Sequence, residues 1–410
     1  MTPPERIPVA VTGMGCISAV ASDLRGHAAA LERPAVHCTP VPEWLFPTTL
    51  AWPVFAAAGD PVSPAARALL ASAGKDGDAS RTVLLAATAL AEALATARLD
   101  RRALATRLVG VVIGTTVGCT FNDEEYYLAW RRGERPDLSP VTRYLNGNLA
   151  AGVHALLGTR GPAAVVTNAC ASGSDAIGLG REWIAAGRCD LVIAGGADEL
   201  SRIAYNGFAS LQLADAGPCR PFDRERRGLN LGEGAGIVVL ESARQAAARG
   251  VAPLGWVRGY GAAADAWHPT APHPEARGLR HALERALADG RVAPESIALV
   301  NAHGTATPAN DLAEARALAA TLPPATPVVS TKGMTGHTLG AAGAIEAILT
   351  LLALGRGATH GTVGCRTADP ELPFAPLPEA AHATLAGRLG ISQSLAFGGC
   401  NAALVLEAAA

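Results

Sequence analysis

One cysteine stands where an apolar strand ends and a helix begins. Residues 165–178 read VVTNACASGSDAIG, in which the apolar run stops at Cys170 and small residues follow. A thiol at a helix N-terminus lies among unpaired backbone N–H groups, which favour the nucleophilic thiolate. The sequence therefore predicts a lowered pKa for Cys170 and amides able to bind an oxyanion. The competing interpretation is a buried structural cysteine, which is the more common kind.

Two histidines stand at comparable junctions. His303 follows the strand-like run SIALVNA, and His337 precedes an Ala/Gly helix in STKGMTGHTLGAAGA, five residues after Lys332. In α/β proteins such strand ends carry the reactive groups. A cysteine protease needs one histidine and an orienting Asn or Asp, whereas two histidines and a lysine suit a reaction that stabilises a second negative charge. Loss of CO2 from a malonyl thioester creates such a charge on an enolate oxygen, which two imidazole N–H groups in a dry site would bind.

The elements that position these residues follow an α/β pattern. Short β-branched runs alternate with Ala/Leu-rich segments: VAVTGMG, LVGVVIGTT, AAVVTNA, DLVIAGGA and GIVVLE, then LVNAHGT, PVVSTKG and AALVLE. Continuous apolar strands predict sheets covered on both faces. Because each half repeats the order strand, reactive turn and helix of small residues, we expect two similar halves, residues 1–250 and 251–410.

Composition excludes several classes of function. The chain has 410 residues, of which 49% are hydrophobic and 17% charged, and a formal net charge of -2, so neither nucleic acid nor an anionic membrane is an expected partner. The eight cysteines show no CxxC pair and no Cys/His metal spacing, which argues against a structural zinc site. The N-terminal segment lacks a secretory signal, which predicts a cytoplasmic protein with free thiols. The apolar stretches from Thr82 and Ala344 contain Glu92 and Glu346 and are expected to be buried helices.

Six motifs follow an initial VTGMGCISAV and resemble a known family. They are TNACASG, CRPFDRERRGLNLGEGAG, GYGAAADAWHPTAP, NAHGTATPANDLAEA, STKGMTGHTLGAAGA and SQSLAFGGCNAALVLE. In this order they are similar to the elongating β-ketoacyl-acyl carrier protein synthases over nearly the whole chain. The resemblance implies a thiolase-like fold, with two α/β halves in a five-layer αβαβα arrangement that dimerises. It also implies decarboxylative Claisen condensation of an acyl thioester with malonyl-acyl carrier protein, with no cofactor or metal, because the phosphopantetheine arrives on the carrier protein.

The resemblance also implies roles for single residues. Cys170 would take the acyl chain as a thioester, and His303 and His337 would bind the malonyl thioester carbonyl and promote decarboxylation. Lys332 would tune the charge of the site, paired with Glu314. The other implied roles are a brace for the helix after His303 (Asp311), contacts to the phosphopantetheine arm (Thr305 and Thr307), the gate of the acyl pocket and second oxyanion-hole amide (Phe397), and the border of the acyl tunnel (Val117 and Cys119). Without the motifs, core packing would explain Phe397 and turn capping the threonines.

The chain departs from the family pattern in several places. In LAFGGCN, Leu395 replaces an aromatic residue and Cys400 a threonine, and Cys119 replaces a glycine. The helix that relatives often load with basic residues reads AGKDGDASRT, with two basic and two acidic side chains. These differences predict an unusual acyl pocket and favour a specialised type II polyketide or polyene ketosynthase.

Alternatives remain at the level of assembly and class. The chain could form a homodimer, or act as the catalytic half of a heterodimer with a chain-length-factor subunit. A catalytically silent partner subunit is less consistent with the retention of Cys170, His303 and His337. An initiating synthase would use Cys-His-Asn, and a biosynthetic thiolase would need a second cysteine near the C-terminus, for which Cys400 is the sole candidate.

Overall fold

The computed structural model describes residues 7–74, 79–116, 118, 124–146 and 148–410. Val117 and Cys119, the expected border of the acyl tunnel, lie outside these residues. The first half contributes strands β1 (Val9–Ser18), β2 (Val109–Gly114), β3 (Ala163–Val166), β4 (Leu191–Asp198) and β5 (Gly234–Ser242). The second half contributes β6 (Gly255–Ala264), β7 (Ile297–Asn301), β8 (Val328–Val329), β11 (Leu389–Leu395) and β12 (Cys400–Ala408), and β9 (Ala358–His360) pairs with β10 (His382–Thr384) in a separate small sheet.

The ten main strands form one sheet whose two halves have the same topology. Its order is β3-β2-β4-β5-β1-β6-β12-β11-β7-β8, and β1 joins β6 through a short antiparallel pairing. By position in the sheet, β1 corresponds to β6, β2 to β7, β3 to β8, β4 to β11 and β5 to β12. The parallel and antiparallel pairings match as well, because β2 runs parallel to β3 and β4, as β7 does to β8 and β11. The repeat expected from the sequence is present in the topology, while the boundary at residue 250 stays a prediction.

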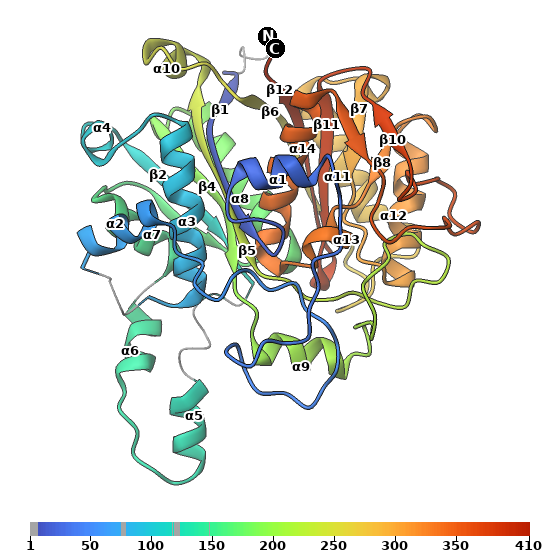
Figure 1. Ribbon diagram of the computed structural model, residues 1–410. Coiled ribbons are helices and arrows are strands. Elements are labelled where there is room, and N and C mark those ends of the chain that lie inside the picture. The colour runs from blue at the N-terminus through green and yellow to red at the C-terminus, as the bar shows by residue number, and fades with distance from the viewer. Residues whose placement is uncertain (1–6, 75–78, 117, 119–123, 147) are drawn as a thin grey trace.

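Helices lie on both sides of each half-sheet, which gives five layers (Figure 1). The outer layer of the first half contains α2 (Pro64–Ser72), α3 (Arg81–Thr96) and α7 (Leu149–Leu157), and the outer layer of the second contains α11 (Arg277–Gly290) and α12 (Pro308–Thr321). Between the half-sheets lie α8 (Ser172–Ala185) and α14 (Ala342–Arg356). The remaining helices are α1 (Leu24–Ala30), α4 (Arg101–Ala105), α5 (Glu124–Arg131), α6 (Ser139–Asn146), α9 (Arg202–Ser210), α10 (Ala243–Ala248) and α13 (Lys332–Thr335). The expected αβαβα arrangement is confirmed.

Glycines in the strands let the outer helices approach the sheet closely, and they do so at matching places in the two halves. A Cβ added to Gly15 of β1 would lie 2.0 Å from the carbonyl oxygen of Ala89 in α3. A Cβ added to Gly261 of β6 would lie 2.1 Å from the carbonyl oxygen of Ala282 in α11. Real Cβ atoms do not come this close to another atom, so at these positions the helix packs directly against the strand backbone. Glycine is thus required at these two strand positions for the spacing of the layers.

A long apolar helix lies in the middle layer. Residues Leu339–Arg356 are long and apolar enough to cross a membrane, but 83% of this window is buried inside the protein. The helix contacts both half-sheets, and so its hydrophobic surface packs on protein on both sides. The interpretation of this stretch as a core helix is confirmed.

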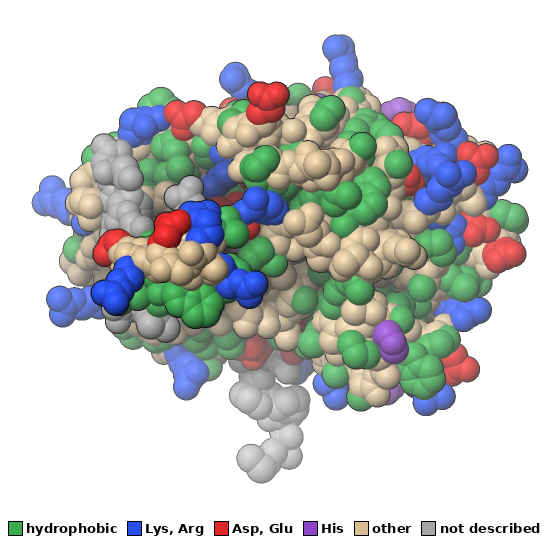
Figure 2. All heavy atoms as spheres, turned by 90° about the horizontal axis from the view of Figure 1, so that it is seen from below, with side chains coloured by type: hydrophobic (Ala, Val, Ile, Leu, Met, Phe, Trp, Pro, Cys, Tyr) green, Lys and Arg blue, Asp and Glu red, His purple; other side chains and the backbone are tan. Residues whose placement is uncertain are grey.

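The face seen from the side of α5, α6 and α9 carries Lys and Arg side chains among acidic, apolar and uncharged ones, without one dominant basic patch (Figure 2).

Candidate active site

Two equivalent turns, one in each half, form the floor of the site. After β3, the 3-10 turn Ala169–Ala171 leads into α8, and Ala169 has φ 46°. Before α14, the 3-10 turn Leu339–Ala341 begins with Leu339 at φ 52°. A positive φ at a residue with a Cβ is strained, and such strain is stored where surrounding contacts enforce it. A Cβ on Gly173 would lie 2.8 Å from the carbonyl oxygen of Gly340, so the two turns are in direct contact.

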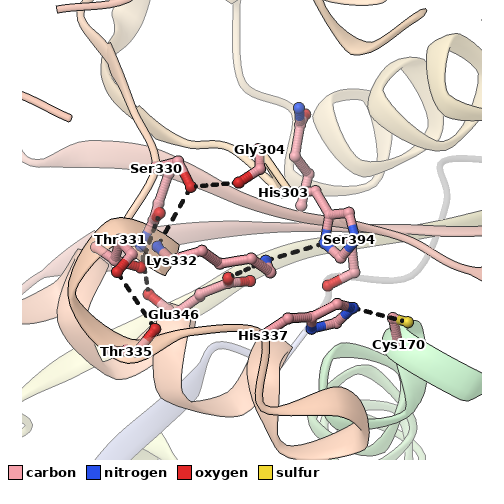
Figure 3. Close-up of polar contacts among 12 residues, drawn as sticks. Cys170, His303, Gly304, Ser330, Thr331, Lys332, Thr335, His337, Glu346 and Ser394 are labelled. Carbon is pink, nitrogen blue, oxygen red and sulfur yellow. Dashed lines mark hydrogen bonds and ion pairs between the residues drawn. The ribbon is translucent and has the colours of Figure 1, made fainter. Parts of the chain in front are cut away.

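This contact brings the predicted nucleophile and both predicted histidines together. Cys170 Sγ lies 3.0 Å from Nε2 of His337, and the rings of His303 and His337 lie 5.1 Å apart at 87° (Figure 3). The sulfur and one nitrogen of each histidine all fall within 4.8 Å of one another. All three side chains line a cavity of about 340 Å³ and are at most 4% exposed. The prediction that these three residues, far apart in the chain, open into one shared cavity is confirmed.

A hydrogen bond to Nδ1, the ring nitrogen that faces away from the cavity, sets the tautomer of each histidine. The backbone N–H of Leu339 donates to Nδ1 of His337 at 3.3 Å. Nζ of Lys332 lies 3.1 Å from Nδ1 of His303 and donates to it. Because Nδ1 accepts in both rings, each neutral imidazole carries its proton on Nε2. Both histidines therefore offer Nε2–H groups at the cavity, as binding of a developing oxyanion requires.

The partner of Lys332 differs from the prediction. Lys332 pairs with Glu346 of α14, and not with Glu314 (Figure 3). Glu314 instead accepts the backbone N–H groups of His303 at 2.6 Å and Gly304 at 2.7 Å, and so it holds the His303 loop. The reason is the direction of the helices: Glu314 on α12 faces the loop that precedes its own helix, whereas Glu346 lies one turn into α14, against α13. A lone acid in the apolar run AIEAILTLL was the signal that could have identified Glu346.

Burial controls the protonation of the site. It lowers the pKa of both His303 and His337 well below the usual value, and the positive charge of Lys332 acts in the same direction, so both rings are neutral. Burial also raises the pKa of Cys170 to about 12, although Lys332 and the backbone N–H of Phe397 act to lower it. The prediction of a lowered pKa for Cys170 is therefore wrong, because desolvation of the thiolate outweighs the effect of the N–H groups at the turn.

Phe397, which the resemblance implies is the gate, lies at the cavity, and so does its backbone N–H. Phe397 opens the 3-10 turn Phe397–Gly399 and lines the cavity, and its N–H hydrogen-bonds to the sulfur of Cys170. Its ring stacks on Phe208 of α9, with centroids 5.4 Å apart. Phe208 also meets the ring of His337 edge-on at 6.5 Å, so the gate and the imidazole share one aromatic contact. Phe208 could not be identified from the sequence, because it lies in a segment without a motif.

The remaining predicted residues lie around the mouth and the back of the site. Thr305 and Thr307 line the cavity, and their hydroxyl oxygens are 2.9 Å apart. Asp311 is fully buried, accepts the backbone N–H groups of Phe222 at 2.7 Å and Ala306 at 3.2 Å, and so braces the start of α12 as predicted. Burial raises the pKa of Asp311 to about 6.

The cysteine and the two histidines are close enough to surround a metal ion, but their hydrogen bonds oppose it. A metal would need the lone pair of each ligating nitrogen, and the nitrogens that face the cavity carry protons, since the opposite nitrogens accept hydrogen bonds. The adjacent Lys332 would also repel a cation. This arrangement suits the binding of an anion.

Comparison with known proteins agrees with this geometry. Residues 6–246 match the family described as Beta-ketoacyl synthase, N-terminal domain, and residues 254–366 its C-terminal domain. A protein of Synechocystis sp. named 3-oxoacyl-[acyl-carrier-protein] synthase 2 is 37% identical over 73% of this chain and 74% of its own. The protein of that name from Staphylococcus aureus (strain COL) is 36% identical over 78% and 80%. Two solved structures are similar to this chain. The ishigamide ketosynthase/chain length factor has a TM-score of 0.88 and 31% identity, and the match covers 99% of this chain and 100% of that one. A beta-ketoacyl synthase from Burkholderia phymatum STM815 has a TM-score of 0.89 and 30% identity, and the match covers 98% of this chain and 100% of that one.

Proposed function

The chain belongs to the β-ketoacyl synthase family, and from that premise we propose how its cavity carries out condensation. The enzyme is an acyltransferase of the 3-oxoacyl-[acyl-carrier-protein] synthase type, with the thiolase-like fold. The observation that carries the mechanism is the convergence of two imidazole Nε2–H groups and a thiol on one buried cavity. Two half-reactions follow from it.

In the first half-reaction the sulfur of Cys170 attacks the carbonyl carbon of an acyl-carrier-protein thioester. Loss of the thiol proton is assisted by three N–H groups that stabilise the thiolate, from the amides of Cys170 and Phe397 and from Nε2 of His337. The two amides then bind the oxyanion of the tetrahedral intermediate. The intermediate collapses and expels the carrier-protein thiolate, which takes up one proton and so balances the proton lost from Cys170. The acyl group remains on Cys170 as a thioester.

In the second half-reaction the malonyl thioester places its carbonyl oxygen at the Nε2–H groups of His303 and His337. The C–C bond to the carboxylate breaks, CO2 leaves, and its electron pair becomes an enolate that these two donors stabilise. The enolate carbon attacks the acyl-Cys170 carbonyl and expels the thiolate, so the chain grows by two carbons. Because no redox step occurs, we propose that the enzyme needs no resident cofactor, and that Thr305 and Thr307 contact the phosphopantetheine arm brought by the carrier protein.

We further propose that the chain works in the cytoplasm with an acyl carrier protein and with a second chain of its own fold. Two similar structures are ketosynthases with a chain length factor: the ishigamide pair, and ApeO with ApeC from Xenorhabdus doucetiae (28% identity, TM-score 0.76). A complete Cys-His-His cavity makes this chain the catalytic member of such a pair. Light scattering on the purified chain distinguishes a homodimer from a chain that dimerises only on co-expression with a chain-length-factor subunit.

The test of the mechanism separates its two half-reactions. With ¹⁴C-malonyl-carrier protein, Cys170→Ala should abolish condensation but retain CO2 release, because both histidines remain, whereas His303→Ala should lose both activities. Cys189→Ser, at a thiol outside the cavity, is the matched control and should keep both. Condensation by Cys170→Ala at the wild-type rate would refute the mechanism, as would loss of CO2 release in a Cys170→Ala protein that is folded.

A further inference from the structure

A polar side chain lies directly behind the nucleophile, at the residue before the strained turn. The backbone N–H of Asn168 donates to the hydroxyl of Ser172 at 2.8 Å, and that hydroxyl donates to the carbonyl of Ala169 at 2.6 Å. These bonds clamp the turn at Ala169 with its positive φ. The side chain of Asn168 adds a contact of its own, because Nδ2 donates to Oδ2 of Asp175 in the first turn of α8 at 2.7 Å.

The same network crosses to the other half of the molecule. The hydroxyl of Tyr260 on β6 donates to Oδ1 of Asp175 at 2.8 Å. The Tyr260 ring packs closely on Gly178, because a Cβ added to that glycine would lie 2.4 Å from the ring. The thiol of Cys400, the first residue of β12, donates to Oδ1 of Asn168 at 3.4 Å. Asn168 is therefore bound from both halves.

Cys400 is in turn part of the gate turn. Its carbonyl accepts the N–H of Ala396 at 2.8 Å, and the N–H of Gly399 donates to the carbonyl of Ala396 at 3.0 Å. These two bonds close the turn that carries Phe397. A displacement of Cys400 must therefore move the N–H of Phe397, one of the two amides of the oxyanion hole.

We infer that Asn168 is a positioning residue that ties the nucleophile turn to the gate turn through Cys400, and so sets the separation of the amides of Cys170 and Phe397. This inference rests on the proposed function, because it concerns the oxyanion hole of acyl transfer. Asn168 makes no contact with the two imidazoles among its described hydrogen bonds, so the malonyl side of the cavity is outside its reach.

Simple packing between the halves does not explain the network. Asp175 is 6% exposed, and burial of a carboxylate costs free energy. An apolar contact between the two halves would not carry this cost. The donors from Asn168 and Tyr260 satisfy that carboxylate with good geometry, which gives Asn168 a fixed orientation. Its remaining polar atom, Oδ1, is thereby aimed at Cys400.

The test compares acyl transfer with decarboxylation in the same variants. Asn168→Ala removes both side-chain bonds, and Cys400→Val removes the thiol donor at similar volume. Because a misplacement of about 1 Å can cost about 10²-fold in rate, each should slow acyl transfer and condensation by about 10- to 100-fold. The rate of CO2 release from malonyl-carrier protein and its KM should stay within about 3-fold of wild type. Cys400→Ser keeps a donor and should restore condensation, and Cys38→Val is the control for loss of a half-buried thiol elsewhere.

The double variant tests the link itself. If Asn168 and Cys400 act as one unit, Asn168→Ala/Cys400→Val should be no slower in condensation than Asn168→Ala alone. Equal losses of condensation and CO2 release, additive effects in the double variant, or failure of Cys400→Ser to restore condensation would each overturn the inference. The proposed function would survive these results, because it fails only if Cys170→Ala or His303→Ala behaves otherwise than stated above.

Discussion

Replacement of Lys332 by methionine tests the charge at the centre of the site. Lys332 is 1% exposed, lies 3.1 Å from Nδ1 of His303 and is ion-paired with Glu346. Methionine keeps most of the length and the apolar stem of the side chain, but it neither donates to His303 nor neutralises Glu346. We expect two separable losses, one of decarboxylation and one of stability.

Their magnitudes follow from the contacts. Without the Nζ donor, His303 can hold its proton on Nδ1, which leaves a lone pair facing the enolate instead of an N–H. Loss of one such donor costs about 10²- to 10³-fold in kcat. Removal of one member of a buried ion pair destabilises a protein by about 3–5 kcal/mol, because the remaining group must either stay charged without a partner or take up a proton on folding. Burial already raises the pKa of Glu346 to about 7, so loss of Lys332 should leave this group protonated at neutral pH.

The double variant Lys332→Met/Glu346→Gln separates the two effects. It replaces the carboxylate by a neutral amide, so it should recover most of the unfolding free energy, measured by urea denaturation, but not the release of ¹⁴CO2 from malonyl-carrier protein. Arg67→Met, which breaks the exposed pair with Asp60, is the control and should change neither quantity. If the double variant decarboxylates malonyl-carrier protein within about 3-fold of wild type, Lys332 acts only as a counter-ion and the tautomer argument fails.

Three further perturbations test other parts of the structure. Because burial raises the pKa of Cys170 to about 12, its alkylation by iodoacetamide, followed by mass spectrometry, should keep rising from pH 6 to pH 9, and a plateau below pH 8 would contradict this. Gly173→Ala should cost about 1–3 kcal/mol of unfolding free energy, since its Cβ would meet α14, whereas Gly152→Ala, with no atom within 4 Å, should gain up to about 1 kcal/mol; equal effects would refute the packing argument. Burial raises the pKa of Glu199 to about 7 from 4.5, so its contribution to stability is complete below pH 4.5 and is lost as the pH rises through 7. The unfolding temperature of Glu199→Gln should accordingly depend less on pH between 4.5 and 7 than that of the wild type. An unchanged pH dependence would contradict the raised pKa of Glu199.

Much of the site could be predicted from residue types at the ends of strands. A thiol at a strand-to-helix junction and a histidine at each of two similar junctions were identifiable because small residues and β-branched runs delimit those turns locally. The repeat of strand, turn and helix was visible for the same reason. Continuous apolar strands predicted sheets covered on both faces, whereas the five-layer αβαβα arrangement came from the resemblance to the family.

The tertiary structure decided what depends on the direction of side chains and on the depth of burial. The resemblance implied Glu314 as the partner of Lys332, but the orientation of α12 and α14 selected Glu346. The local environment of Cys170 suggested a lowered pKa, yet exclusion of water by the whole fold raised it. Asn168 and Cys400 are 232 residues apart in sequence, and only the meeting of the two half-sheets puts the thiol of one at the amide of the other. Local patterns specify which groups can react, whereas partners and protonation states arise from contacts that form only when both halves pack together.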